Sequence, residues 1–123
     1  MAGTLVITTL SDGTNSTSAT NCIQGSAKAW ANYNGSTQTI RASFNVSSVT
    51  YNAVGDYSFN FTTAFADTSY ATVVGTVGDS SPYNQPLIYS TAGYTTTSVR
   101  VYNSPDYSLS VQNSAIMTIA VFR

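Results

Sequence analysis

Apolar and polar residues alternate along much of this chain, most clearly between residues 28 and 65. Every second residue is apolar in three runs, at Ile40, Ala42, Phe44 and Val46, at Val49 and Tyr51, and at Tyr57, Phe59 and Phe61. A period of two gives a strand one buried and one solvated face, as is usual in antiparallel sheets. The stretch therefore predicts β-strands, and no comparable stretch shows the helical period of about 3.6 residues.

The turns between these strands also leave signals. Asn34-Gly35 favours a two-residue hairpin turn, because both central positions of a type I′ turn need positive φ angles. The apolar spacing widens to three between Val46 and Val49, which indicates a β-bulge at positions 47 and 48 within one continuing strand. The strands expected in this part of the chain are 27–33, 37–46 with a continuation through Val49 and Tyr51, and 57–62. A turn is expected at 52–55.

The same pattern, with weaker alternation, predicts strands before and after this stretch. Ser11 to Gly25 is polar and has a turn signal at Asp12-Gly13, so it is expected to be a linker. The last strand, at 114–122, is almost wholly apolar, which places it in the middle of a sheet or inside an oligomer. Further strands are expected at 3–10, 70–77, 86–90 and 94–102, with a small one at 107–111.

Together these elements predict an all-β fold, an antiparallel sandwich or barrel-like sheet of about seven or eight strands. Residues 1–26 are expected to form an N-terminal strand and polar linker, and residues 27–123 the β-sandwich domain. If successive strands are simple up-and-down neighbours, the loops sort to two ends. The turns at 34–35, 64–69 and 92–93 would lie at one end, and 10–26, 52–55, 78–85 and 103–113 at the other.

Charge is sparse, because only 7% of the 123 residues are Asp, Glu, Lys or Arg and the net charge is −1. Phosphate binding needs a cluster of basic residues, so the composition argues against a nucleic-acid partner. It offers no polybasic patch for a membrane surface, and the first ten residues resemble neither a signal peptide nor a membrane span. Low charge with many aromatic residues is typical of subunit interfaces, so a homo-oligomer is expected.

The chain has no histidine, no glutamate and one cysteine, Cys22. These absences exclude Ser-His-Asp and Cys-His catalysis and zinc sites of the His/Cys type. An aspartate pair acting on glycosides stays open as a third possibility, although its four candidates fall in predicted turns: Asp56, Asp67, Asp79 and Asp106. The prediction is a non-enzymatic protein with no catalytic residues, no cofactor and no metal site. Arg41 and Arg100, at polar strand positions, are expected to pair with aspartates within the chain or across a subunit boundary, and contact with a ligand is the alternative.

The predicted long loops are rich in tyrosine, asparagine, aspartate and glutamine. Tyrosine offers a flat ring to apolar faces, and the amides and carboxylates offer fixed donors and acceptors to hydroxyl groups. Such loops suit polar recognition, but loops are also polar for want of anything to bury. The candidate receptor-binding residues are Asn52, Asp79, Tyr83, Asn84, Gln85, Asn103, Asp106 and Tyr107.

The segments KAWANYNG, IRASFNVSSVTYNAVGDYSFNFTTAFAD and IAVFR resemble a domain found at the C-terminal end of bacteriophage and prophage tail-fibre proteins. The resemblance covers Cys22 to about Ala71 closely and the rest loosely. It implies a trimeric, β-rich tip that attaches the virion to a host receptor, and it supplies no catalytic motif. Receptor-contacting positions in such tips vary with the host, so none is transferred to this chain.

The resulting hypothesis is a homotrimeric, receptor-binding tip at the end of a phage tail fibre, acting outside the host cell. Its expected partners are the rest of the fibre and a bacterial surface glycan or protein, with no nucleic acid and no membrane insertion. The alternative is a structural module for virion decoration or fibre assembly, without ligand binding.

Overall fold

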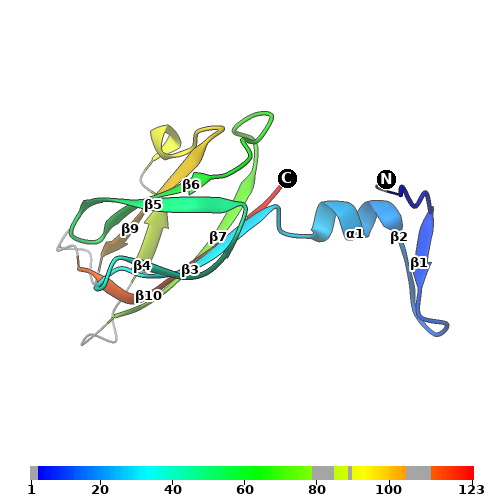
Figure 1. Ribbon diagram of the computed structural model, residues 1–123, viewed down its shortest axis with the longest axis horizontal. Helices are drawn as coiled ribbons and strands as arrows, with labels where there is room; N and C mark the ends of the chain where they lie inside the picture. Colours follow the sequence, from blue (N-terminus) through cyan, green and yellow to red (C-terminus); the bar gives the residue numbers. More distant parts are fainter. Residues whose placement is uncertain (1–2, 79–84, 89, 105–111) are drawn as a thin grey trace.

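The computed structural model describes residues 3–78, 85–88, 90–104 and 112–123. Two four-stranded antiparallel sheets pack face to face and do not close into a barrel (Figure 1). The first sheet has the order β4 (Thr39–Phe44), β3 (Ala29–Asn34), β10 (Ser114–Phe122) and β7 (Ala71–Gly78). The second has the order β5 (Val46–Ala53), β6 (Asp56–Phe61), β9 (Ser98–Ser104) and β8 (Gln85–Ile88). The predicted antiparallel sandwich is confirmed.

The core lies between the inward faces of the two sheets. Tyr33 packs edge-on against Tyr57 and Phe59, with ring centroids 5.3 and 5.9 Å apart. Such edge-to-face pairs are favourable beyond the area they bury. The alternation in β3 holds as the sequence indicates, because Ala29 and Ala31 are buried while Trp30 is exposed on the other face.

Strand β10 lies in the middle of the first sheet, between β3 and β7, as its apolar sequence predicts. Its inward residues are buried, and its outward residues are half-buried. The small strand expected at 107–111 lies outside the described residues. The turn expected at 92–93 forms a 3-10 helix, Thr91–Gly93.

The expected continuous strand from residue 37 to 51 is wrong, because the chain changes sheets at Asn45. Asn45 has a positive φ of 54°, and its side chain bonds to the backbone of Lys28 and Thr63 from both sheets. These contacts turn β4 of the first sheet into β5 of the second. The predicted bulge is confirmed, since the register shifts between Val46 and Ser48.

The predicted hairpin after β3 forms, but not through a two-residue turn. Four residues, 35–38, separate β3 from β4, and the positive φ falls on Gln38 instead of the Asn34-Gly35 pair. The Asn34 Oδ1 accepts hydrogen bonds from the backbone N–H groups of Ser36 and Thr37, both at 2.9 Å. This side-chain turn replaces the expected backbone geometry.

The up-and-down assignment of loops to ends is partly wrong. The backbone N–H of Gly35 donates to the carbonyl of Ser114 at 2.8 Å, so the 35–38 turn shares an end with the turn at 54–55 and with residues 78, 85, 104 and 112–114. We call this the loop end. At the other end, the entry end, Lys28 donates to Val121 at 2.7 Å. The chain crosses from one sheet to the other at Asn45, which a simple up-and-down arrangement does not include. As a result, β3 runs from the entry end to the loop end and β4 runs back, opposite to the directions that the simple arrangement assigns.

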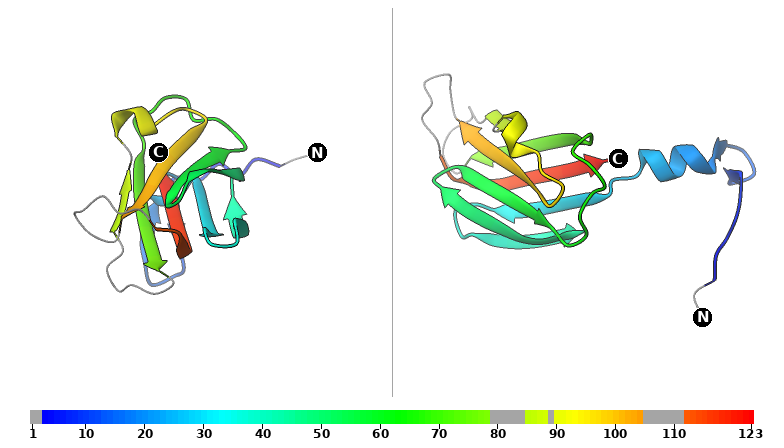
Figure 2. Two further views of the ribbon diagram at one scale, coloured as in Figure 1. Left: turned by 90° about the vertical axis from the view of Figure 1, so that its left-hand side faces the viewer. Right: turned by 90° about the horizontal axis from the view of Figure 1, so that it is seen from above.

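Residues 3–26, the N-terminal segment, extend away from the sandwich at the entry end (Figures 1 and 2). A hairpin of β1 (Thr9–Ser11) and β2 (Ser16–Ser18) leads into helix α1 (Ala19–Gly25). The expected 3–10 strand is therefore mostly absent, and the expected polar linker is a hairpin and a helix. The turn at Asp12 is confirmed, and no described helix is long and apolar enough to cross a membrane.

Side chains at the segment's chain reversals explain why this polar sequence is structured. The Asp12 Oδ1 accepts from the backbone N–H groups of Thr14 and Asn15 at 2.9 and 2.7 Å. Ser18 caps α1 by accepting from the N–H of Asn21 at 3.1 Å. At the other end of α1, the Lys28 ammonium donates to the carbonyl of Ile23, where a cation is favoured.

An aromatic cluster closes the sandwich at the entry end. Tyr70 packs against Phe61, Phe65 and Tyr94, with ring centroids 4.9 to 5.9 Å apart. Its hydroxyl lies 2.9 Å from the carbonyl oxygen of Thr95. Burial raises the pKa of Tyr70 to about 12, although the bond to Thr95 acts in the other direction.

This raised pKa predicts a loss of stability in alkali. An unfolded tyrosine has a pKa of about 10, so the neutral hydroxyl of Tyr70 stabilises the fold fully below pH 10. Between pH 10 and about 12 the free energy of unfolding should fall by about 1 kcal/mol per pH unit. Urea unfolding of wild type and Tyr70→Phe across this interval measures the effect. An equally steep fall in the phenylalanine variant would contradict it.

Candidate functional site

The loop end is held together by hydrogen bonds between two separate parts of the chain. The Asn113 Oδ1 accepts from the backbone N–H of Gly55 and from the Tyr57 hydroxyl, both at 3.0 Å. The Tyr57 hydroxyl in turn accepts from the N–H of Ser114 at 3.3 Å. These bonds fix the turn between β5 and β6 against the start of β10.

Asn103, a predicted receptor contact, is fully buried. Its N–H donates to the carbonyl of Gly55 at 2.7 Å, and its side-chain amide donates to the carbonyl of Gln112 at 3.0 Å. Asn103 therefore ties the end of β9 to Gln112 and to the neighbouring turn at Gly55. Contact with a receptor, as predicted, would require this side chain to leave its buried position.

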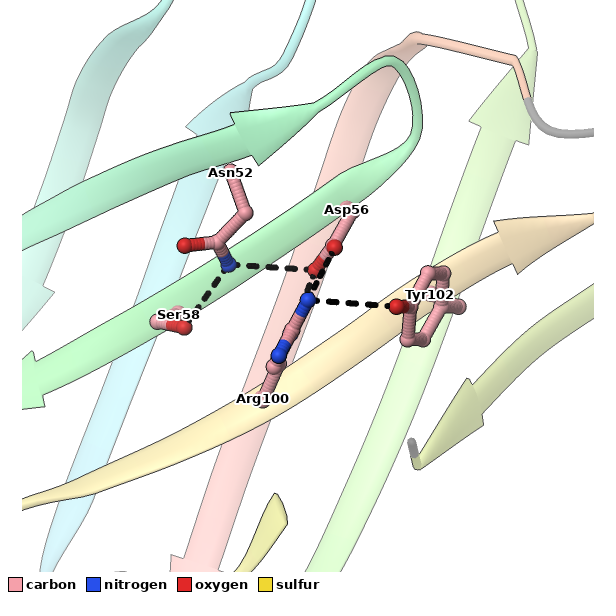
Figure 3. A network of polar contacts seen from close by, with 5 residues as sticks. All are labelled: Asn52, Asp56, Ser58, Arg100 and Tyr102. Carbon is pink, nitrogen blue, oxygen red and sulfur yellow. Dashed lines mark hydrogen bonds and ion pairs between the residues drawn. The ribbon is translucent and has the colours of Figure 1, made fainter. Parts of the chain in front are cut away.

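A polar network lies on the outer face of the second sheet, near the loop end (Figure 3). The Arg100 guanidinium donates through Nε to Asp56 Oδ1 at 2.9 Å and through a terminal nitrogen to Asp56 Oδ2 at 2.6 Å. The same terminal nitrogen lies 3.2 Å from the Tyr102 hydroxyl. Asn52 donates to Asp56 Oδ1 at 3.1 Å and to the Ser58 hydroxyl at 2.9 Å. We call these five residues the Asp56 network.

The local sequence and the strand register together build the network. Gly55, with a φ of +68°, makes the tight turn that places Asp56 at the first position of β6. Across β9, Asp56 pairs with Tyr102 and Ser58 pairs with Arg100. Side chains two residues apart on a strand share a face, so all four lie outward. The expectation that Arg100 pairs with an aspartate is confirmed.

The electrostatics of the network favour an ionised Asp56. The residue is 3% exposed, and this burial by itself raises the pKa of the carboxyl. The hydrogen bonds from Arg100, Asn52 and Tyr102, with the charge of Arg100, outweigh burial and bring the pKa below its usual value. Asp56 is therefore a fixed anion with a bidentate cationic partner at neutral pH.

Hydroxyl and amide groups continue this polar face beside the network. Asn60 donates to the Ser48 hydroxyl at 3.0 Å and to that of Thr50 at 2.9 Å. The guanidinium of Arg100 stands 5.5 Å from the ring centroid of Tyr102, which is within cation–π range. Chemically, this face can offer amide, guanidinium and aromatic groups to a polar ligand, as sugar-binding surfaces do.

The structure brings the bases of both predicted binding loops together. Gln85 is exposed at the start of β8 and pairs with Ser104, where the second loop begins. Asn52 is exposed at the opposite edge of the same sheet and belongs to the Asp56 network. The other predicted contacts lie outside the described residues, namely Asp79, Tyr83, Asn84, Asp106 and Tyr107.

Sequence reasoning did not include Asp56, Ser58, Arg100 and Tyr102 among the candidate receptor-binding residues. Asp56 has a turn signal and Arg100 lies at a polar strand position, but their contact spans 44 residues and depends on register. One sequence signal could have found them. Ser58, Arg100 and Tyr102 all occupy the alternate positions of β6 and β9 that face away from the core. Side chains at every second position of paired strands share a face.

The described aspartates do not form a catalytic pair. Asp56 lies at the loop end with Arg100, whereas Asp67 lies in the connection from β6 to β7 and pairs with Arg123. Among residues 3–78, 85–88, 90–104 and 112–123, no group of three or more His, Cys, Asp or Glu side chains is placed to hold a metal ion.

Comparison of this chain with protein-family models, with curated proteins and with solved structures finds no match.

Proposed function

We propose that this chain is the non-enzymatic receptor-binding tip of a bacteriophage tail fibre. In this proposal three copies attach the virion to a glycan or protein on the bacterial surface, through the loop end. The supporting observation is the opposition of the two ends. The N-terminal segment leaves the sandwich at the entry end, next to Val121, while the described strand ends on either side of residues 79–84 and 105–111 meet at the far end.

The rigidity of the loop end supports a role in binding. Preorganised side chains lose less conformational freedom when a ligand arrives. The bonds of Asn113 and Asn103 hold the turn and both strand ends that carry the loops. The Asp56 network beside them presents Asn52, Arg100 and Tyr102 in fixed positions. A sugar could use such a face as an extension of the loop surface.

One observation favours the alternative, a structural module of the virion or fibre. Exposed apolar side chains gather on the outer face of the first sheet, including Trp30, Phe44 and Val73. Such patches mark interaction surfaces, and assembly would use them without any receptor. A screen of the purified domain against host cells and glycan arrays separates the two, since a purely structural module would show no preference among hosts.

Alanine replacement of Tyr83, Asn84 and Tyr107 together should reduce adsorption to host cells at least tenfold. Central aromatic contacts commonly contribute 2 kcal/mol or more of binding free energy, roughly a thirtyfold change in affinity. The measurement is the fraction of fluorescently labelled protein bound to cells. Thermal unfolding should be unchanged within a few degrees, because the sequence predicts that the three positions lie in loops.

The matched control is Thr63→Ala at the entry end. Thr63 is exposed, and its bonds to Asn45 are made by its backbone, so the truncation leaves them in place. This variant should adsorb like wild type. Undiminished adsorption by the triple variant would overturn the assignment of the site to the loops.

A further inference from the structure

The N-terminal segment has the least burial of any part of the described chain. No residue from 3 to 26 is buried, and the helix contributes none. Leu5, Val6 and Leu10 are exposed apolar side chains of this segment. Ile23, on α1, is 65% exposed. The apolar side chains of the N-terminal segment are therefore mostly exposed to solvent instead of packing against the rest of the chain.

Such a segment needs another surface to remain ordered. Isolated helices below about 12 residues are marginal in water, and α1 has seven. A lone two-stranded hairpin is also marginal, and here each strand has three residues. Ordering the backbone costs about 1 to 2 kcal/mol per residue, which burial must offset. The apolar residues of α1, at positions 19, 22 and 23, follow the spacing of one helix face.

Exposed apolar side chains also lie on the sandwich. On the outer face of the first sheet, register aligns Phe44, Trp30, Ala120 and Val73 in one row across all four strands. Trp30 follows two residues after Lys28, whose ammonium is bound to the end of α1. All but two of the exposed large apolar side chains in the described residues lie on this sheet face or on the N-terminal segment.

We propose that Leu10 and Ile23 of the N-terminal segment, with Trp30, Phe44 and Val73 of the first sheet, form the surface through which copies of this chain associate. This inference rests on the homo-oligomer of the proposed function, but it does not depend on the receptor-binding loops. We call these five residues the association surface.

Charge identifies the occupant as a second copy. Asp12 is the only charged residue among 3–26, and its carboxylate is held by its own turn. The sheet row contains no charged residue at all. A surface that meets its own copy must avoid like charges, whereas discrimination of a foreign partner commonly relies on complementary charge. An uncharged surface avoids repulsion between like charges when two copies meet, and it offers no complementary charge by which to select a foreign partner.

The available area requires both parts of the surface. Four strands about 4.8 Å apart, each spanning roughly 23 Å, give a sheet face on the order of 400 Å². A standard interface buries about 800 Å² on each partner. The sheet face alone is therefore too small, and the N-terminal segment extends it.

Light scattering of the full chain tests the proposal. Wild type should have a mass near three times the 13.0 kDa of one chain. Ile23→Asp and Val73→Asp should each shift the protein towards the monomer mass, because each copy would then bring an unpaired charge into the apolar contact. Val54→Asp is the matched control, since Val54 is 47% exposed in the turn at the loop end, and it should keep the wild-type mass.

Two further measurements keep the test decisive. Near-ultraviolet circular dichroism should show an intact aromatic core in all variants. If an aspartate variant unfolds, a second experiment takes the place of that variant: the Cys22 thiols of the wild-type chain are cross-linked with a bis-maleimide. Cross-linked chains should form in wild type and not in Cys22→Ser. A monomeric wild type, or aspartate variants that keep their mass, would overturn the inference.

Host-cell adsorption distinguishes this result from the proposed function. A monomer that adsorbs to host cells would overturn the association surface and the three-copy part of the proposed function, but it would leave receptor binding through the loop end standing. The opposite result has two parts: wild type is an oligomer that does not adsorb to host cells, and Ile23→Asp dissociates it. That result would overturn receptor binding and support the association surface.

Discussion

Arg100→Ala should lower the free energy of unfolding at pH 7 by about 2 to 3 kcal/mol, because it leaves the buried Asp56 carboxylate without its cation. Removing one partner of a fully buried pair costs about 3 to 5 kcal/mol. The Arg100 side chain is 36% exposed, so solvent screening reduces the effect. Urea unfolding measures the difference, and a change below about 0.5 kcal/mol would contradict the role of the pair.

The same pair predicts how stability depends on acid. The pKa of Asp56 is lowered in the folded chain, so its contribution is complete above the unfolded value of about 4. That contribution is lost as the pH falls through the lowered folded pKa. Asp56→Asn should therefore be less stable than wild type at pH 7 and should lose less stability between pH 5 and 2.

Asp67→Asn is the matched control, because Asp67 pairs with Arg123 on the surface. The hydrogen bond from Arg123 also lowers the pKa of Asp67, but solvent screens an exposed pair. Its loss should be much smaller than that of Asp56→Asn. Combining Arg100→Ala with Asp56→Ala should restore part of the stability, since no unpaired buried charge then remains.

Gly55→Ala should destabilise the chain by about 2 to 5 kcal/mol. The φ of +68° at Gly55 costs a residue with a side chain about 1 to 2 kcal/mol. An added Cβ would also stand 2.6 Å from the Gln112 carbonyl oxygen and 2.8 Å from that of Asn103. Both are backbone atoms held by hydrogen bonds, so the strain of overpacking adds about 1 to 3 kcal/mol.

Gly13→Ala separates the two causes. Gly13 also has a positive φ, of 96°, but a Cβ there would meet nothing within 4 Å. This variant incurs only the backbone cost, in the hairpin outside the sandwich. Chemical unfolding followed by Trp30 fluorescence should show a clearly larger loss for Gly55→Ala. Equal losses would mean that the close approach at the loop end contributes nothing.

Much of the fold follows from local sequence. Alternation assigns Phe59 and Phe61 to the core face of β6, and the widened spacing after Val46 marks the bulge. The change of sheet at Asn45 was not predictable in this way. It depends on hydrogen bonds to Lys28 and Thr63, 17 and 18 residues away. Without it, the order of strands and the ends of their loops cannot be assigned.

The candidate site was predictable only in its loops and in Asn52. Asn103 is a polar residue at the end of a strand, which locally looks like an exposed loop position. Its burial results from the approach of Gly55 and Gln112, which lie 48 and nine residues away. Helix α1 was missed for a different reason, because its seven residues make only about two turns, and three apolar positions in so short a stretch do not establish a helical period.

The pairing of β3 with β10 has a consequence for synthesis. Ala29 pairs with Val121, 92 residues later, and β10 lies between β3 and β7 in the first sheet. Long sequence separations slow folding, because the closure of a long loop precedes the contacts that stabilise it. As the chain emerges from the ribosome, β3 has its hairpin partner β4 but no central neighbour until the last strand appears. The sandwich therefore forms after translation of β10, and chains that terminate before it expose the inner face of the first sheet to aggregation.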